Sequence, residues 1–174
     1  MLFRSQEIDR EPVDFLARFT ASEQFEKVFR EGMGLVEETA NYLDGPGRKD
    51  ARLLDRNGAI AYATESMRLT TRLMQLASWL LLQRAISAGE LSPDDARKEK
   101  HRISLTDIGA GHPLTGAEQL PESLTQLVER SLHLHQRILK LDAMLAAKAK
   151  AGGQSESPLT EQLDRLARAY KAAR

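Results

Sequence analysis

The chain has 174 residues, with 25 basic and 25 acidic side chains and no cysteine. This length predicts one domain with tails, and the balanced charge argues against a broad basic surface for nucleic acid. The absence of cysteine excludes disulfides, a thiol nucleophile and a cysteine-based metal site, and it suits a reducing, cytoplasmic location. The most apolar run, between Arg72 and Arg84, is about half the length of a bilayer span, so we expect no membrane insertion. The charged first residues are unlike a signal peptide.

The first clear element is a two-sided helix over residues 22–43, which follows an N-terminal arm of residues 1–21. Ser22 and Glu23 open it, and Gly-Pro-Gly at residues 45–47 ends it, because glycine suits a helix C-cap and proline cannot continue the helix. Its apolar face comprises Phe25, Val28, Phe29, Met33, Leu35, Val36, Ala40, Tyr42 and Leu43.

A long second helix is predicted over residues 50–88, running through Gly58, where the helix can bend. Its apolar residues fill a sector of roughly 200°, whereas one packing neighbour needs only about 100°. We therefore expect this helix to be central and covered from two sides. The predicted apolar sector contains Ile60, Ala63, Met67, Leu69, Thr70, Leu73, Met74, Leu76, Ala77, Leu80 and Leu81.

Ser92 and Pro93 predict a short helix over residues 93–101, because serine is a good N-cap and proline fits the first helical position. Residues 102–120 hold three glycines and a proline without any sustained period, and we expect a flexible loop there. The third helix is predicted over residues 121–150. Its apolar stripe comprises Leu124, Leu127, Val128, Ser131, Leu134, His135, Ile138, Leu139, Leu141 and Leu145.

Residues 152–174 are predicted to form a flexible linker followed by an amphipathic tail helix. The tail is either a weakly helical end or a peptide that docks into a partner's groove. Its candidate docking residues are Leu159, Leu163, Leu166 and Tyr170. Together these elements predict an all-α protein, a three-helix bundle domain at residues 22–151 flanked by an arm and a tail.

No constellation of residues predicts an enzyme or a cofactor. His135 and Asp142 lie on the same side of the third helix, but no nucleophile motif accompanies them, so we interpret them as polar groups that fix helix register. Gly109 and Gly111 follow no strand and precede no Gly-Lys-Ser or Gly-Lys-Thr, so they do not predict a phosphate loop. His133 and His135 point to different sides of a helix and cannot share a metal ion.

A candidate interface lies on the narrow polar face of the second helix. Arg and Trp dominate protein–protein hot spots, so this face is either a binding patch or a solvated stripe with a tryptophan under the loop. At the C-terminal end of the second helix, the apolar side chains of Trp79, Leu82 and Ile86 need cover from the following loop or from a second copy of the chain. The candidate residues are Glu65, Arg68, Arg72, Trp79, Leu82 and Ile86. The pattern does not distinguish a homodimer seam from a partner site.

Two ungapped blocks resemble the RcdA family, the regulators of CtrA degradation of alphaproteobacteria. The first block contains FREGM, LVEETA and YLDGPGR within residues 29–48, and the second contains ESMRLTTRLMQLASWLLLQRA at residues 65–85. LPE at residues 120–122 and LVERSL at residues 127–132 also fit the family. The resemblance spans residues 25–142.

This resemblance implies a non-enzymatic homodimer that acts as an adaptor in cell-cycle proteolysis. Family members work with the ClpXP protease, a response-regulator primer and a cyclic-di-GMP-binding adaptor, and they present CtrA-type substrates for destruction at a cell pole. The alternatives are a polar-localisation scaffold that never touches substrate and, with less support, a helical DNA-binding dimer. The neutral charge counts against direct nucleic-acid binding.

Overall fold

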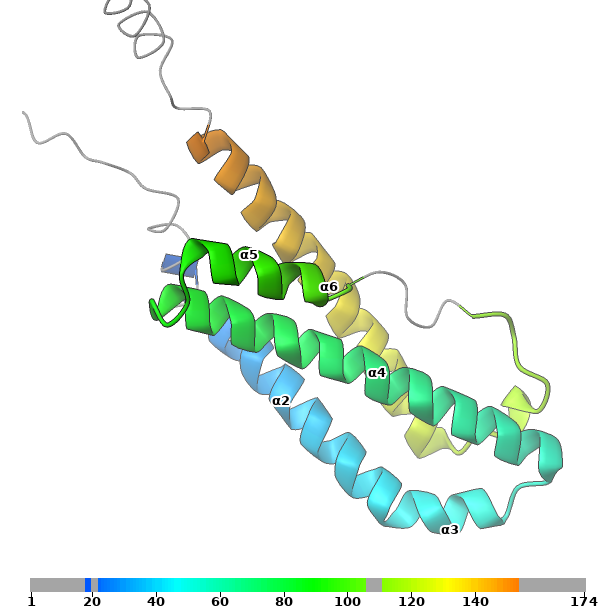
Figure 1. The fold of residues 1–174 in the computed structure, drawn as a ribbon. Coiled ribbons are helices and arrows are strands. Elements are labelled where there is room, and N and C mark those ends of the chain that lie inside the picture. The colour runs from blue at the N-terminus through cyan, green and yellow to red at the C-terminus, as the bar shows by residue number, and fades with distance from the viewer. Residues whose placement is uncertain (1–17, 20–21, 106–110, 154–174) are drawn as a thin grey trace, which may run out of the picture.

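The structure, a computed structural model, describes residues 18–19, 22–105 and 111–153. The described residues form helices α2 (Glu23–Asp44), α3 (Pro46–Arg52), α4 (Arg56–Ser87), α5 (Pro93–Arg102), the 3-10 helix η1 (Ala117–Gln119) and α6 (Glu122–Gly153). Helix α4 packs against both α2 and α6, α5 folds back along α4, and the C-terminal turns of α6 project beyond the other helices (Figure 1). The predicted all-α bundle with a long central helix is confirmed.

Helix α2 begins as its sequence predicts. The Ser22 hydroxyl accepts a hydrogen bond from the Phe25 backbone N–H at 3.2 Å, which satisfies one of the free donors of the first turn. The predicted apolar face turns inward, with Phe25, Leu35 and Tyr42 buried. The Tyr42 hydroxyl donates to Asp50 of α3 at 2.9 Å and so joins the two helices, and burial raises the pKa of Tyr42.

The single helix predicted over residues 50–88 is wrong, because two helices occupy this stretch. Helix α3 starts at Pro46, directly after α2, and the chain breaks between α3 and α4. Asp55 caps the new helix by accepting a hydrogen bond from the Gly58 N–H at 2.9 Å. Gly58 thus lies in the first turn of α4, where a Cβ atom would come within 2.5 Å of Gln119 Oε1.

The remaining boundaries lie close to the predicted ones. Ser92 caps α5 with its hydroxyl, which accepts from the Asp95 N–H at 3.2 Å. The connection to α6 contains η1, preceded by Gly116 at φ 89°, a backbone conformation that glycine adopts without strain. The arm up to residue 17, residues 106–110 of the loop and the tail from residue 154 lie outside the described residues.

The core lies where α2, α4 and α6 meet. Gly32 allows the close approach, because a Cβ atom there would come within 2.6 Å of Leu80 Cδ1 and 3.6 Å of Leu134 Cδ2. The buried apolar cluster comprises Phe25, Val28, Leu35, Tyr42, Leu69, Leu73, Leu76, Trp79, Leu80, Leu124, Leu127, Leu134 and Ile138.

Candidate functional site

The charged side chains in the middle of α4 face the interior and the neighbouring loop. Arg72 is only 1% exposed, and its Nη1 donates to the Ser131 hydroxyl of α6 at 2.7 Å. Burial lowers the pKa of this guanidinium, because the charged form loses hydration. One turn earlier, Arg68 donates to Glu65 at 2.8 Å, and both side chains are largely covered.

The apolar end of the candidate interface is also inside the chain. The Trp79 indole N–H donates to Asp142 of α6 at 3.0 Å, and Lys100 of α5 lies 3.3 Å from the same carboxylate oxygen. Leu82 is buried and Ile86 is partly buried. The cover that we expected from a loop or a second copy thus comes, for Trp79, from α6.

The structure therefore places Arg72, Trp79 and Leu82 of the candidate interface inside the bundle. Glu65, Arg68 and Ile86 are partly exposed. The reason is the pairing with α6, whose Ser131 and Asp142 provide polar partners inside the bundle. A contact between the candidate set and a partner chain stays a prediction.

The outward face of α4 is apolar. Met67 is 71% exposed and Met74 is 65% exposed, although both were predicted in the buried sector. Ile60 and Leu81 are also exposed, and a spacing of seven residues puts all four on one line along the helix. We call Ile60, Met67, Met74 and Leu81 the outer stripe.

Between residues 57 and 81 no fully exposed residue of α4 is charged; Glu65 and Arg68 are partly exposed, and Arg56 and Arg84 are exposed at the two ends of the stripe. The exposed residues of α4 between Asn57 and Leu81 are, besides the stripe, Ala59, Ala63, Thr70, Thr71 and Ser78. A helix that borders water normally carries charged side chains on its outer face. An apolar, uncharged face about 32 Å long is typical of a surface that another chain covers.

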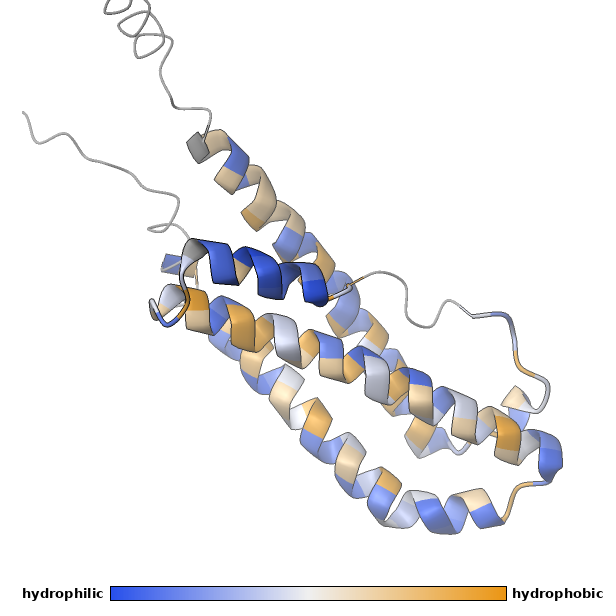
Figure 2. Cartoon of the chain, viewed as in Figure 1, coloured by the Kyte–Doolittle hydropathy of each residue, from blue (hydrophilic) through white to orange (hydrophobic). Residues whose placement is uncertain are grey.

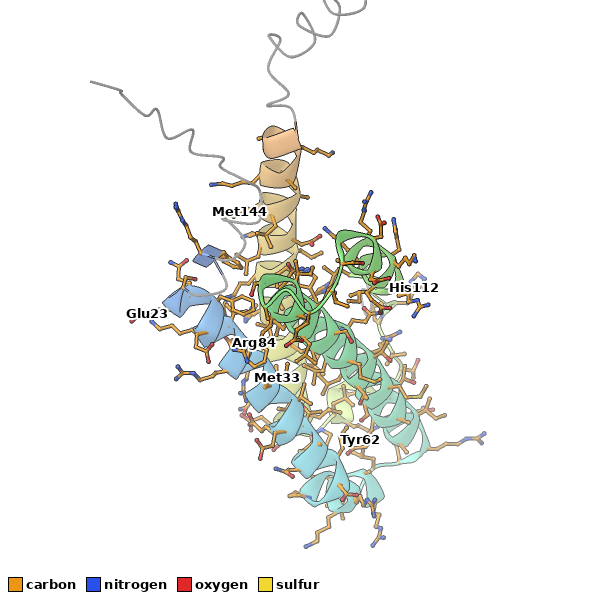
Figure 3. The ribbon with its side chains drawn as sticks, turned by 60° about the vertical axis from the view of Figure 1, so that its left-hand side comes forward. Glu23, Met33, Tyr62, Arg84, His112 and Met144 are labelled. Carbon is orange, nitrogen blue, oxygen red and sulfur yellow. The ribbon has the colours of Figure 1, made fainter. Side chains whose placement is uncertain are left out.

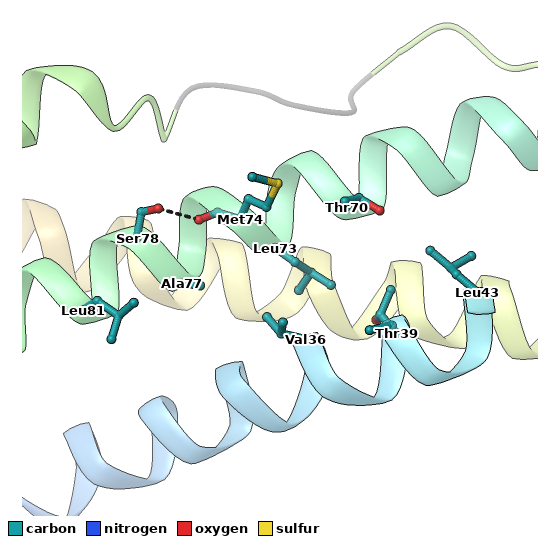
Figure 4. Close-up of a pocket in the computed structure, with 10 residues that line it drawn as sticks. Val36, Thr39, Leu43, Thr70, Leu73, Met74, Ala77, Ser78 and Leu81 are labelled. Carbon is teal, nitrogen blue, oxygen red and sulfur yellow. Dashed lines mark hydrogen bonds between the residues drawn. The ribbon is translucent and has the colours of Figure 1, made fainter. Parts of the chain in front are cut away.

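A groove between α2 and α4 borders the outer stripe. Its volume is about 390 Å³, and Figure 4 shows side chains from both helices along it. The Thr39 hydroxyl, on the α2 side, is buried without a hydrogen-bond partner among the described residues. The lining residues are Val36, Thr39, Ala40, Leu43, Thr70, Leu73, Met74, Ala77, Ser78 and Leu81.

A second groove lies on the other side of the stripe, where α5 ends. It has a volume of about 370 Å³ and is lined by Thr71, Met74, Gln75, Ser78, Arg102 and Ile103. Met74 and Ser78 therefore form a ridge between two hollows. A partner chain could therefore pack around the protruding Met74 and place its own side chains in the two grooves.

The seam between α2 and α6, unlike the α2–α4 side, is lined by charged side chains. Arg130 of α6 pairs with Glu38 of α2 at 2.7 Å, and Arg137 pairs with Glu31. Such exposed pairs contribute about 0–1 kcal/mol each, but they give this seam a charged, hydrated surface. Because the α2–α6 seam is charged and the α2–α4 side is apolar, the α2–α4 side is the candidate protein-binding surface.

The other candidates for chemistry have structural roles in the described residues. His135 is buried and its Nε2 lies 2.8 Å from the Leu105 carbonyl oxygen, so it ties the loop to α6 rather than pairing with Asp142. Gly111 packs against the Arg68 guanidinium. No cluster of three or more metal-ligating side chains occurs in the described part.

The described helices include none that is long and apolar enough to cross a membrane. The candidate docking residues of the tail, Leu159, Leu163, Leu166 and Tyr170, lie outside the described residues.

The sequence analysis missed the outer stripe because an apolar sector of roughly 200° does not specify which part turns inward. The signal that could have found it is the set of small residues that lie seven apart between the stripe members, Ala63, Thr70 and Ala77. Small side chains flanking large ones at a spacing of seven are typical of a helix–helix contact.

The fold and this surface define an all-helical bundle protein with an uncovered apolar face of the kind that binds other proteins. A family model described as a protein of unknown function (DUF1465) matches residues 16–170. The crystal structure of RcdA from Caulobacter crescentus CB15 is 48% identical, with a TM-score of 0.58, over 74% of this chain and 96% of that chain. No curated protein matches the chain. The chain belongs to the RcdA family, as the sequence blocks predicted.

Proposed function

We propose that this protein is a non-enzymatic, homodimeric adaptor of regulated proteolysis, which helps deliver CtrA-type response-regulator substrates to the ClpXP protease in the cytoplasm, at a cell pole. The observation that carries the proposal is the 48% identity to RcdA over 96% of that protein's chain. The uncovered α2–α4 side supports it, since an adaptor acts through surfaces that bind other proteins.

The mechanism requires no bond chemistry from this chain. A rigid bundle holds cargo or a second adaptor, while another segment engages the protease together with its response-regulator primer and the cyclic-di-GMP-binding adaptor. Tethering raises the effective concentration of a weakly recognised substrate to about the millimolar range when the links are short and flexible.

The test is degradation of purified CtrA-type substrate by ClpXP, the primer and the cyclic-di-GMP-binding adaptor, with and without this protein. We expect the initial rate to rise at least severalfold when the protein is added, because the substrate is then held near the protease. A fluorescent substrate with a strong degradation signal of its own is the control, and its rate should not change. An unchanged rate for every response-regulator substrate tested contradicts the adaptor role.

A further inference from the structure

The end of the bundle at α3 exposes cations beside a leucine. Helix α3 lies at the opposite end from the first turn of α2 and the last turn of α6 (Figure 1). Lys49, Arg52 and Arg56 are exposed and have no ion-pair partner among the described residues. Leu53 is 86% exposed, the highest value of the large apolar side chains in the described part. Figure 3 shows nitrogen-tipped side chains that extend outward from this end of the bundle, beyond Tyr62. We call Lys49, Arg52, Leu53 and Arg56 the basic end.

The carboxylates close to the basic end already have partners. Asp44 pairs with Arg48 at 2.6 Å, so we do not count either residue as part of the basic end. Asp50 accepts a hydrogen bond from a tyrosine hydroxyl of α2 at 2.9 Å. Asp55 accepts from the Gln119 side chain at 2.9 Å and caps α4. These contacts hold the carboxylates within the fold, and the cations of the basic end are left for another molecule.

Helix stability explains two of the three cations but not Arg56. Lys49 and Arg52 lie in the last turn of α3, where a cation interacts favourably with the helix dipole. Arg56 is the first residue of α4, where the dipole favours a negative charge, and the first turn of α4 holds no acidic residue. The exposed Leu53 gains nothing from folding either, because its side chain stays in water. Arg56 and Leu53 therefore favour a binding role for this end.

We propose that the basic end binds an acidic segment of a partner protein, in which carboxylates flank one large apolar side chain. Arginine binds a carboxylate with two parallel N–H donors, and arginine clusters recognise acidic motifs. Lys49 and Arg52 are three residues apart on one face of α3, and the chain from Arg52 to Arg56 spans at most about 13 Å. An extended segment of about four residues thus reaches these cations and covers Leu53 with its apolar side chain.

The surroundings favour a protein segment over nucleic acid or a membrane. The chain as a whole has no net charge, whereas duplex DNA and anionic membranes bind broad basic surfaces. Figure 2 shows a short hydrophobic connection between the hydrophilic α3 and the hydrophilic start of α4. A surface that places an apolar side chain between cations matches a peptide that carries both kinds of group.

Fluorescence anisotropy of the full chain with a labelled peptide tests the proposal. The probe is a short peptide of glutamates with one central leucine, and the comparison peptides replace either the leucine by serine or the glutamates by glutamine. We expect the natural chain to bind the probe more tightly than either comparison peptide. Arg56→Glu and Leu53→Ser should each raise the dissociation constant at least about tenfold. Lys140→Glu, which reverses an exposed cation of α6, is the matched control and should change it less than about twofold.

Thermal unfolding separates recognition from folding. Arg56→Glu places an acid where the dipole of α4 favours one, so we expect the midpoint to rise by about 1–3 °C while binding is lost. A lower midpoint would assign Arg56 to the stability of α4 and overturn the proposal. Unchanged binding by Arg56→Glu overturns it too. So does failure of the natural chain to bind the probe, whether or not duplex DNA or phosphatidylserine vesicles bind instead. The degradation assay remains the separate test of the adaptor role.

Discussion

Arg72 of α4 is a buried cation that donates a hydrogen bond to Ser131 on α6. A buried charge is costly unless its donors are satisfied, so the Ser131 hydroxyl contributes to the stability of the α4–α6 contact. The same hydroxyl donates to the Val128 carbonyl at 2.7 Å, which orients it toward the guanidinium. This small polar group therefore helps fix which face of α4 turns inward.

Replacing that hydroxyl tests the interpretation. Ser131→Ala should lower the free energy of unfolding by about 1–3 kcal/mol, because a buried charged donor loses one acceptor. Ser123→Ala, at an exposed position of the same helix, should change it by less than about 0.5 kcal/mol. Urea unfolding followed by circular dichroism measures both. Equal effects of the two substitutions would show that the Arg72 contact does not stabilise the fold.

Asp55 provides a pH-dependent cap at the start of α4. The hydrogen bond from the Gly58 N–H, followed by that from the Gln119 side chain, lowers the pKa of this carboxyl below its ordinary value of 3.8. A lowered folded-state pKa means that the stabilisation is fully present above the ordinary value and is lost as the pH falls through the folded-state value.

Asp55→Asn keeps a capping side chain that does not titrate. We expect the difference in unfolding free energy between natural protein and variant to be constant from pH 7 to pH 5. As the pH falls below about 3.8, the natural protein should lose stability relative to the variant, since only the aspartate must take up a proton. Urea midpoints at each pH provide the measurement, and a pH-independent difference would rule out this role for the carboxylate.

At the scale of the elements, the sequence predicts the helices well and the rotation of α4 poorly. Ser22 and Ser92 cap their helices as predicted, because capping is a local interaction between neighbours in the chain. The break between α3 and α4 was not predicted. Asp55 is a local N-cap signal for α4, but only Gly58 was considered as a point where the helix is interrupted. The inward face of α4 depends on partners in α6 that are distant in the chain, so local periodicity cannot determine it.

Two glycines of α2 offer a matched test of helix packing. Gly32→Ala should destabilise the protein by about 1–3 kcal/mol, because the added methyl group collides with Leu80 in the core. Gly34→Ala meets nothing within 4 Å and should stabilise it by about 0.5–1 kcal/mol through better helix propensity. Thermal unfolding of both variants checks the signs. A stabilising Gly32→Ala would mean that the α2–α4 contact is looser than described.

At the scale of the whole molecule, the sides of the bundle differ in the polarity of the surface that they expose. The α2–α6 seam is closed by ion pairs, and α5 shields part of α4 with a hydrophilic helix. The α2–α4 side leaves methionines exposed beside an apolar groove. From the sequence, Trp79, Leu82 and Ile86 were the residues expected to need cover from a loop or a second copy, whereas the exposed apolar residues of α4 are those of the outer stripe.

Sedimentation equilibrium of the full chain tests most directly whether the outer stripe is covered by association. We predict a mass twice the 19.4 kDa of one chain for the natural protein and for Met144→Glu. Met74→Glu should raise the dimer dissociation constant at least about tenfold, because a charge would be buried in the contact, and so yield monomer at low concentration. A natural chain that sediments at 19.4 kDa at every concentration would contradict the account.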